Sequence, residues 1–405
     1  MSKTFVQFGA GNIGRSFLGQ LFSRGGYEIV FVDVDETLIH QLNEENAYRI
    51  VIKHPDGTDE IISIDNVRAV NGLDDEAVAE VIADCDLAAT AVGARALGHV
   101  APTLAKGLMA RRRRGRGTLD IILAENLQGA ASFLKEALSR QLTEDFDIDR
   151  RVGLIETSIG KMVPIMRHED LEIDPLWVFA EPYNTLIVDA KAFRNPVPNI
   201  DGLKPVDNIA AYVDRKLFIH NLGHSATAYL GYEKEPHWDY IWEVLEDDQI
   251  ASTVRRAMRQ SSEALLAEYP ETFSKSDLAE HVEDLLARFR NKALGDTIHR
   301  VGRDLYRKLG RRDRLVGALL LVLKHDREAD AIARAVRAAV QFEKSDEKGE
   351  LFPADREFAE KEKPLGLQHI LRKVCELAPE NPLDTKAINA ILNSKGQTAC
   401  TIQST

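Results

Sequence analysis

The sequence has few residues that could form disulfide bonds or structural metal sites. Its 405 residues include only three cysteines, Cys85, Cys375 and Cys400, which lie far apart along the chain. They form no C-x-x-C pair, and no histidine follows them at zinc-finger spacing. We therefore expect neither a disulfide framework nor a bound metal.

Long apolar runs are also missing. The longest candidate, around residues 315–323, is much shorter than the roughly 18–20 apolar residues that a membrane helix needs. The N-terminal residues MSKTFVQFGAG lack the basic region, apolar stretch and cleavage site of a signal peptide. We expect a cytoplasmic protein with no membrane partner.

Positive charge is in deficit, because 52 Lys and Arg residues face 64 Asp and Glu residues and leave a formal net charge of −12. Such a surface repels nucleic acid, so we expect no nucleic-acid partner, and any phosphate on a ligand must meet a local concentration of positive charge. The basic tract at residues 111–117 has no interleaved aromatic residues. We interpret it as a solvated connection without a function of its own.

The length predicts two or three domains, and the patterning favours two. In the first half, short apolar runs alternate with helical patterns, as in βαβ units with a mostly parallel sheet. We expect strands at residues 4–8, 28–32, 87–92, 119–123, 152–156, 176–179 and 185–188, helices at 15–24 and 36–45, and a hairpin pairing 49–53 with 60–63.

Beyond Asn208 nearly all of the chain fits helical periodicity. The proline-rich stretch 195–199 interrupts regular structure just before it. We therefore predict a Rossmann-type, doubly wound α/β domain at residues 1–200 and a mostly helical substrate and catalytic domain at residues 201–405.

A G-x-G-x-x-G motif follows the first predicted strand and opens the first predicted helix. It consists of Gly9, Ala10, Gly11, Asn12, Ile13 and Gly14. Its glycines suit a tight turn, close approach of the backbone to a pyrophosphate, and close packing of helix on strand. The helix N-terminus that follows would present N–H groups to the phosphates.

An acidic residue stands where this fold places the partner of the adenosine ribose. Asp33 ends the second predicted strand, 19 residues after Gly14, and a carboxylate there repels the 2′-phosphate of NADP and favours NAD. A turn or a helix cap is the alternative for Asp33. Thr90 and Val92 end a later predicted strand and are expected beside the nicotinamide ribose.

In the helical half, Lys216, Asn221 and His224 form the pattern K-x-x-x-x-N-x-x-H. On an α-helix, His224 lies about 80° and Asn221 about 140° around from Lys216, so all three can face one cleft. Taken singly, each also fits a surface lysine, a capping asparagine or a buried histidine.

With this pattern, the sequence resembles the polyol-specific long-chain dehydrogenase (mannitol dehydrogenase) family, particularly the branch acting on mannitol 1-phosphate. The resemblance covers roughly residues 4–345 and includes the glycine motif, Glu125-Asn126, 198–200, 215–218, 227–231, 300–303, 307–309 and 313–315. It implies a monomer that transfers hydride between a secondary alcohol and NAD without a metal. It also implies that Lys216 is the general base, that Asn221 and Asn126 stabilise the alkoxide, and that His224 orients the substrate.

The substrate implied is D-mannitol 1-phosphate, interconverted with D-fructose 6-phosphate. Arg300, Arg303 and Arg307 recur at helical spacing and would form one basic stripe on a continuous helix, suited to a phosphate. We prefer Arg303, Arg307 and Lys308 as substrate ligands, with an exposed face balanced by aspartates as the alternative.

The sequence departs from the family at Gly160-Lys161, where Asp-Arg is usual. Lys161 is a candidate to replace the arginine charge, and a non-phosphorylated polyol or a hexuronate remains an alternative substrate. An NAD-binding sensor that engages a protein partner is an alternative of another class, although such a sensor needs no proton acceptor.

Overall fold

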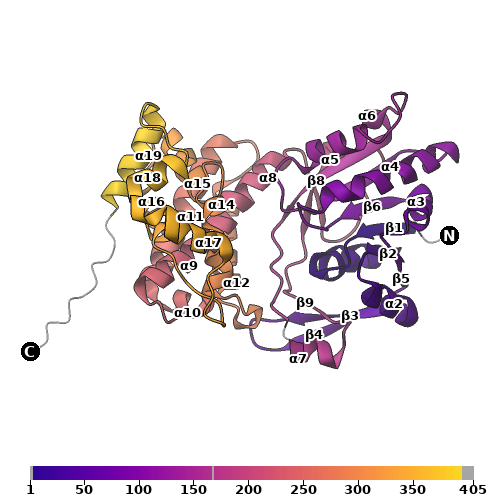
Figure 1. The fold of residues 1–405 in the computed structure, drawn as a ribbon, viewed down its shortest axis with the longest axis horizontal. Helices are drawn as coiled ribbons and strands as arrows, with labels where there is room; N and C mark the ends of the chain where they lie inside the picture. The colour runs from indigo at the N-terminus through magenta and orange to yellow at the C-terminus, as the bar shows by residue number, and fades with distance from the viewer. Residues whose placement is uncertain (1–2, 167, 395–405) are drawn as a thin grey trace, which may run out of the picture. The chain divides into compact units, whose positions relative to one another are not determined.

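The computed structural model describes residues 3–166 and 168–394 (Figure 1). The chain divides into two compact units, of which the first ends at Tyr212 and the second begins at Val213. The division falls within helix α8 (Ile209–Arg215). Cys400 lies outside the described residues, and Cys85 and Cys375 are buried as free thiols.

An eight-stranded sheet forms the centre of the first unit, in the order β11-β10-β8-β7-β6-β1-β2-β5. All neighbouring strands run parallel except β8 and β10. The strands are β1 (Lys3–Phe8), β2 (Tyr27–Asp33), β5 (Val67–Asn71), β6 (Leu87–Thr90), β7 (Leu119–Leu123), β8 (Val152–Ile159), β10 (Leu186–Asp189) and β11 (Leu203–Val206). The parallel strands joined by helices confirm the predicted α/β class.

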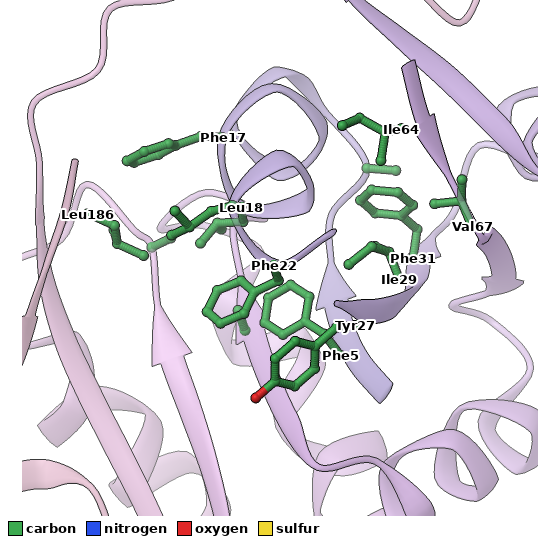
Figure 2. Close-up of a cluster of buried hydrophobic side chains, with 14 of the residues drawn as sticks. Phe5, Phe17, Leu18, Phe22, Tyr27, Ile29, Phe31, Ile64, Val67 and Leu186 are labelled. Atoms are coloured by element: carbon green, nitrogen blue, oxygen red, sulfur yellow. The ribbon is translucent and has the colours of Figure 1, made fainter. Parts of the chain in front are cut away.

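Side chains alternate between the two faces of this sheet, so each face has its own apolar cluster. In β1, Phe5 joins one cluster and Val6 joins the other. The first cluster lies beneath the π-helix η1 (Gly14–Gly19) and α1 (Gln20–Arg24), and Figure 2 shows its aromatic centre, where the rings of Phe5 and Phe22 stack with centroids 4.0 Å apart. The second is covered by α3 (Asp75–Asp84), α4 (Leu97–Arg113) and α5 (Ala130–Ser139).

A smaller sheet, in the order β4-β3-β9, contains the predicted hairpin. Strand β3 (Ala47–Lys53) pairs antiparallel with β4 (Asp59–Asp65), and Gly57 adopts a left-handed φ of +84° in the turn between them. Strand β9 (Val178–Ala180) begins two residues later than expected. The predicted helix 36–45 is confirmed as α2 (Glu36–Glu45), where the Asp35 carboxylate accepts the N–H groups of Thr37 and Leu38. The first unit also contains α6 (Ile148–Arg151), α7 (His168–Ile173) and the short helix η2 (Ala190–Ala192).

The second unit is mostly helical, as predicted, and its described residues include one isolated β-bridge between Tyr240 and Thr297. Helix α9 (Leu222–Lys234) is buried along most of its length and packs against α10, α11, α13 and α16. The further helices are η3 (Lys216–Asn221), α10 (Ile241–Glu246), α11 (Asp248–Glu268), α12 (Lys275–Phe289), η4 (Lys292–Leu294), α13 (Ile298–Gly302), α14 (Leu305–Lys308), α15 (Val316–Lys324), α16 (Asp330–Val340), α17 (Pro353–Lys361), η5 (Lys363–Leu365), α18 (Leu367–Lys373) and α19 (Pro382–Asn393). Among the residues that the structure describes, no helix combines the length and apolar character needed to cross a bilayer.

The interpretation of the basic tract as a solvated connection is wrong for Arg111. This side chain is buried at the end of α4, and its guanidinium donates to the carbonyl oxygens of Ala83, Cys85, Gly117 and Thr118. Neighbouring arginines bind acidic side chains, as Arg114 does with Glu80 and Asp84. Several arginines of the tract therefore bind carbonyl oxygens or carboxylates of the first unit.

Candidate functional site

The glycine motif forms a tight turn in which the surroundings of its three glycines differ. Gly9 has a φ of +88°, and a Cβ there would lie 2.5 Å from the carbonyl oxygen of Ala91. A Cβ on Gly14 would overlap the carbonyl oxygen of Gly9, whereas a Cβ on Gly11 would meet no described atom within 4 Å. The open space over Gly11 fits the approach of a pyrophosphate to the backbone.

Asp33 holds this turn in place. Its Oδ2 accepts the N–H of Ala10 at 2.6 Å, and its Oδ1 accepts the N–H of Val34 at 2.7 Å. Arg15 supports the same turn by donating from Nε to the carbonyl oxygen of Ala10 at 2.6 Å. Because Asp33 remains partly exposed, its carboxylate is placed to accept hydrogen bonds from a ribose.

The next strand ends are organised by a buried carboxylate that was not among the predicted site residues. Glu125 accepts the N–H of Val92 at 3.0 Å and that of Gly93 at 2.8 Å. Thr90 is fully buried, and its Oγ1 has no hydrogen-bond partner in the described part of the chain. Asn126, directly after Glu125, is exposed. The pair Glu125-Asn126 stands at the carboxyl end of a predicted strand and belongs to the family resemblance. The backbone groups that Glu125 binds follow a different strand, β6, so no local pattern indicates this contact.

We predicted that Lys216, Asn221 and His224 lie on one regular α-helix, and the structure shows that they do not. Lys216–Asn221 form the π-helix η3, and α9 begins at Leu222. A π-helix closes i→i+5 hydrogen bonds, so its turn is wider than that of an α-helix and the rotation per residue is smaller. The predicted angular separations of 80° and 140° are therefore wrong, although the three residues remain on one continuous helical segment.

The side-chain amine of Lys216 has a lowered pKa. Burial is the main cause that lowers its pKa to about 8, and the guanidinium groups of Arg314 and Arg307 lower it further. Asp313 acts in the opposite direction. A lysine in this environment is partly neutral at ordinary pH, as a general base must be.

His224 is fixed on two sides. Its ring stacks on Phe289 with centroids 4.8 Å apart and an interplanar angle of 10°. Its Nε2 lies 3.2 Å from Oδ2 of the buried Asp296. Asn221 accepts the hydroxyl of Ser225 through its backbone carbonyl oxygen, which leaves its side-chain amide out of that contact.

The predicted basic stripe does not form, because the chain is not one helix there. Helix α13 ends at Gly302 and α14 begins at Leu305, with Asp304 between them in the left-handed region at φ +75°. Arg307 donates from Nε to Asp304 at 2.5 Å, and Arg303 lies over the ring of Phe352 at 5.4 Å from its centroid. These side chains are directed by local partners and not by helical periodicity.

The two predicted lysine ligands of the substrate are both buried. In the second unit, Lys308 donates from Nζ to the carbonyl oxygen of Val301, and burial holds its pKa well below the ordinary value. In the first unit, Lys161 donates from Nζ to Oδ1 of Asn184 at 2.9 Å and lies over the ring of Phe17. Within residues 3–166 and 168–394, no three or more His, Cys, Asp or Glu side chains are grouped to hold a metal ion.

Comparison with known proteins covers nearly the whole chain. Residues 3–202 match the mannitol dehydrogenase Rossmann domain, and residues 208–388 match the mannitol dehydrogenase C-terminal domain. A mannitol-1-phosphate 5-dehydrogenase of Brevibacillus brevis is 36% identical over 94% of this chain and 95% of its own length. That of Bacillus subtilis is 34% identical over 93% of this chain and 96% of its own length.

The chain belongs to the mannitol dehydrogenase family.

The fold is shared with a solved mannitol 2-dehydrogenase. The Pseudomonas fluorescens mannitol 2-dehydrogenase, solved as a ternary complex with NAD and D-mannitol, superposes with a TM-score of 0.74 at 17% identity, covering 96% of this chain and 91% of that one. The Rossmann domain followed by a mostly helical domain is therefore the architecture of this mannitol dehydrogenase family member.

In this mannitol dehydrogenase family chain, sequence reasoning passed over Arg314. The residue lies in the stretch 313–315 of the family resemblance but is not among the predicted site residues. Its Nε donates to Oδ1 of Asp313 at 2.7 Å, and its charge is the second cause of the lowered pKa of Lys216. No local pattern distinguishes Arg314 from Arg311 or Arg312, so only its position near Lys216 reveals it.

Proposed function

We propose that this protein is an NAD-dependent oxidoreductase that interconverts D-mannitol 1-phosphate and D-fructose 6-phosphate with lysine as the general base. The observation that carries the proposal is Lys216, whose pKa of about 8 reflects burial beside Arg314 and Arg307. The names of the relatives support the substrate, and the glycine turn supports the cofactor.

NAD binding is assigned to the first domain, residues 1–200. Gly11 leaves room for the pyrophosphate, and Asp33 presents a carboxylate to the adenosine ribose. That negative charge disfavours the additional phosphate of NADP. Thr90 and Val92 stand at the neighbouring strand end, where the ribose of the nicotinamide half is expected.

Proton transfer is assigned to the second domain, residues 201–405. Bound NAD supplies the acceptor for the hydride that leaves the carbinol carbon. Neutral Lys216 removes the proton of the reacting hydroxyl through Nζ, and the resulting ammonium returns it when the ketone is reduced. Because the lowered pKa leaves a fraction of Lys216 neutral near pH 7, a side-chain base is available to take the hydroxyl proton.

Asparagine side chains at positions 221 and 126 are assigned to the developing alkoxide. An amide N–H₂ group donates a stronger hydrogen bond to a negatively charged oxygen than to a neutral hydroxyl. It therefore stabilises the developing alkoxide more than the alcohol. His224 is assigned to the orientation of the substrate.

The phosphate group is assigned to Arg303, Arg307 and Lys308. Guanidinium groups bind phosphate through paired N–H donors. Lys308 is buried near Arg307 and Arg314 with a lowered pKa, so an anion placed beside it would restore its charged form. Lys161 is assigned to a substrate hydroxyl or the phosphate as the replacement for the arginine usual in the family.

The test is a substrate panel. The purified protein is mixed with NAD and mannitol 1-phosphate or mannitol, and with NADH and fructose 6-phosphate or fructuronate, while absorbance of reduced nicotinamide is followed. We expect kcat/KM for mannitol 1-phosphate to exceed that for mannitol at least a hundredfold. Preference for mannitol or fructuronate would assign the protein to a non-phosphorylated polyol or hexuronate instead.

The Lys216→Ala variant separates the enzyme from a sensor. We expect it to bind NAD with unchanged affinity while turnover falls by about two to four orders of magnitude. A wild-type protein that binds NAD but reduces it with no member of the panel would contradict the proposed activity and favour a sensor.

A further inference from the structure

Asp296 is a buried carboxylate on a rigid part of the second unit. It lies between η4 and α13, and its side chain is 7% exposed. Its carbonyl oxygen accepts the N–H of Ile241 at 2.9 Å, and the next residue, Thr297, forms a β-bridge with Tyr240. The backbone that carries this carboxylate is therefore well fixed.

The two oxygens of Asp296 face two different partners. Oδ1 accepts the guanidinium of Arg300, and Oδ2 lies 3.2 Å from Nε2 of His224. Burial by itself raises the pKa of Asp296, but His224 and Arg300 outweigh it and hold the pKa below the ordinary value. Asp296 is thus an anion at neutral pH, and Arg300 is its counterion.

The position of Asp296 determines which ring nitrogen of His224 is available to a ligand. Nε2 has almost no solvent exposure, and no partner in the described residues satisfies hydrogen-bond geometry with it. The 3.2 Å contact with Asp296 is thus close but not aligned as a hydrogen bond, as is common for catalytic contacts in the absence of substrate. Because Nε2 is buried against Asp296, Nδ1 is the ring nitrogen left for a substrate, and Phe289 covers one face of the ring.

We propose that Asp296 is a positioning residue that accepts Nε2–H of His224, so that the unprotonated Nδ1 accepts a hydrogen bond from a substrate hydroxyl. Such an outer carboxylate fixes both the ring orientation and the tautomer of a histidine. An unprotonated ring nitrogen and a carbonyl oxygen are both hydrogen-bond acceptors, so Nδ1 cannot bind the carbonyl oxygen of the ketose. The hydroxyl it binds is therefore one that the polyol and the ketose both carry, next to the reacting carbon.

This inference rests on the proposed function, because it gives His224 its role in binding the polyol. It predicts that Asp296→Asn lowers kcat/KM about 10- to 100-fold, through KM in both reaction directions, while NAD affinity is unchanged. The matched control is Asp239→Asn, since Asp239 is an exposed carboxylate nearby that pairs with Lys344. We expect that control to retain wild-type kcat/KM.

A double-mutant cycle tests whether Asp296 acts through His224. His224→Asn should lose at least as much kcat/KM as Asp296→Asn, and the double variant should lose no more than His224→Asn, because Asp296 acts only through His224. Losses that multiply, or an Asp296→Asn variant with unchanged kcat/KM, would overturn the inference while leaving the proposed activity intact.

The tautomer provides a readout that does not depend on activity. Long-range ¹H–¹⁵N spectra are recorded of wild-type protein labelled with ¹⁵N-histidine, and the signals of His224 are assigned as those missing from the spectrum of His224→Asn. They should show a protonated Nε2 and an unprotonated Nδ1. The reverse tautomer would overturn the inference even if the enzyme is active. The expected tautomer in a protein inactive on every polyol would support the Asp296 contact and reject the proposed function.

Discussion

The pH dependence of catalysis should report the environment of Lys216, and replacing Arg314 with glutamine should move it. Lys216 must be neutral to take a proton from the alcohol, so kcat/KM for oxidation should rise with pH and level off above about 8, where its amine is deprotonated. Ketone reduction needs the ammonium form and should decline over the same range.

The size of the effect follows from the lowered pKa. At pH 7 an amine with a pKa of about 8 is roughly one-tenth neutral, whereas one at the ordinary 10.5 is neutral in about one molecule in 3,000. The environment therefore raises the neutral, reactive fraction of Lys216 at pH 7 about 300-fold. This difference in pKa corresponds to about 3.4 kcal/mol in the free energy of deprotonation. Burial provides the largest part, so removal of one neighbouring charge should reverse only some of it.

Arg314→Gln removes the larger of the two arginine contributions. It also leaves Asp313, which favours the ammonium form, with Arg307 at 3.7 Å as its ion-pair partner. We expect the alkaline plateau to begin about half to one pH unit higher. At pH 7, kcat/KM for mannitol 1-phosphate oxidation should then fall about 3- to 10-fold, whereas at pH 10 it should match the wild type.

The assay is the full pH profile of kcat/KM for the wild type, Arg314→Gln and Arg312→Gln. Arg312 is exposed in the same segment and does not act on Lys216 among the causes of its lowered pKa. It therefore controls for the loss of one positive charge. A wild-type plateau that begins near pH 10, or equal shifts in both variants, would refute the reasoning.

Three further experiments test the cofactor site and the fold. Gly11→Ala should keep the wild-type melting temperature but weaken NAD binding at least tenfold, because its Cβ occupies the open space expected to hold the pyrophosphate. Gly14→Ala should lower both the melting temperature and the NAD affinity. Equal melting temperatures of the two variants in calorimetry would contradict this contrast. Asp33→Asn should reduce the preference for NAD over NADP about tenfold in steady-state kinetics, since the charge that repels the 2′-phosphate is gone, and an unchanged ratio would count against the ribose assignment. Arg111→Met should destabilise the protein by about 2–4 kcal/mol in urea unfolding, because four carbonyl oxygens lose their donor; the exposed Arg113→Met should cost little, and similar losses in both would refute the assigned role of Arg111.

The strands and the cofactor turn were predictable because their signals are local. The glycine motif, its spacing to Asp33 and the apolar runs around β1, β2 and β7 each lie within a few tens of residues. Strands β5 and β11 were not predicted, since each is a short edge strand with polar residues, such as Arg68 and Lys204. Each also pairs on one side only, β5 with β2 and β11 with β10, so neither shows the apolar run of a strand buried within the sheet.

The sequence by itself determined the two-part architecture, the family and the residue types available for hydride and proton transfer. Only the tertiary structure decided how those residues are arranged. It converted the segment around Lys216 into a π-helix, broke the basic stripe at Asp304, and brought Arg314 to Lys216 and Asp296 to His224. The physical reason is that a pKa and a ring orientation depend on neighbours in space, and these neighbours lie 98 and 72 residues away along the chain.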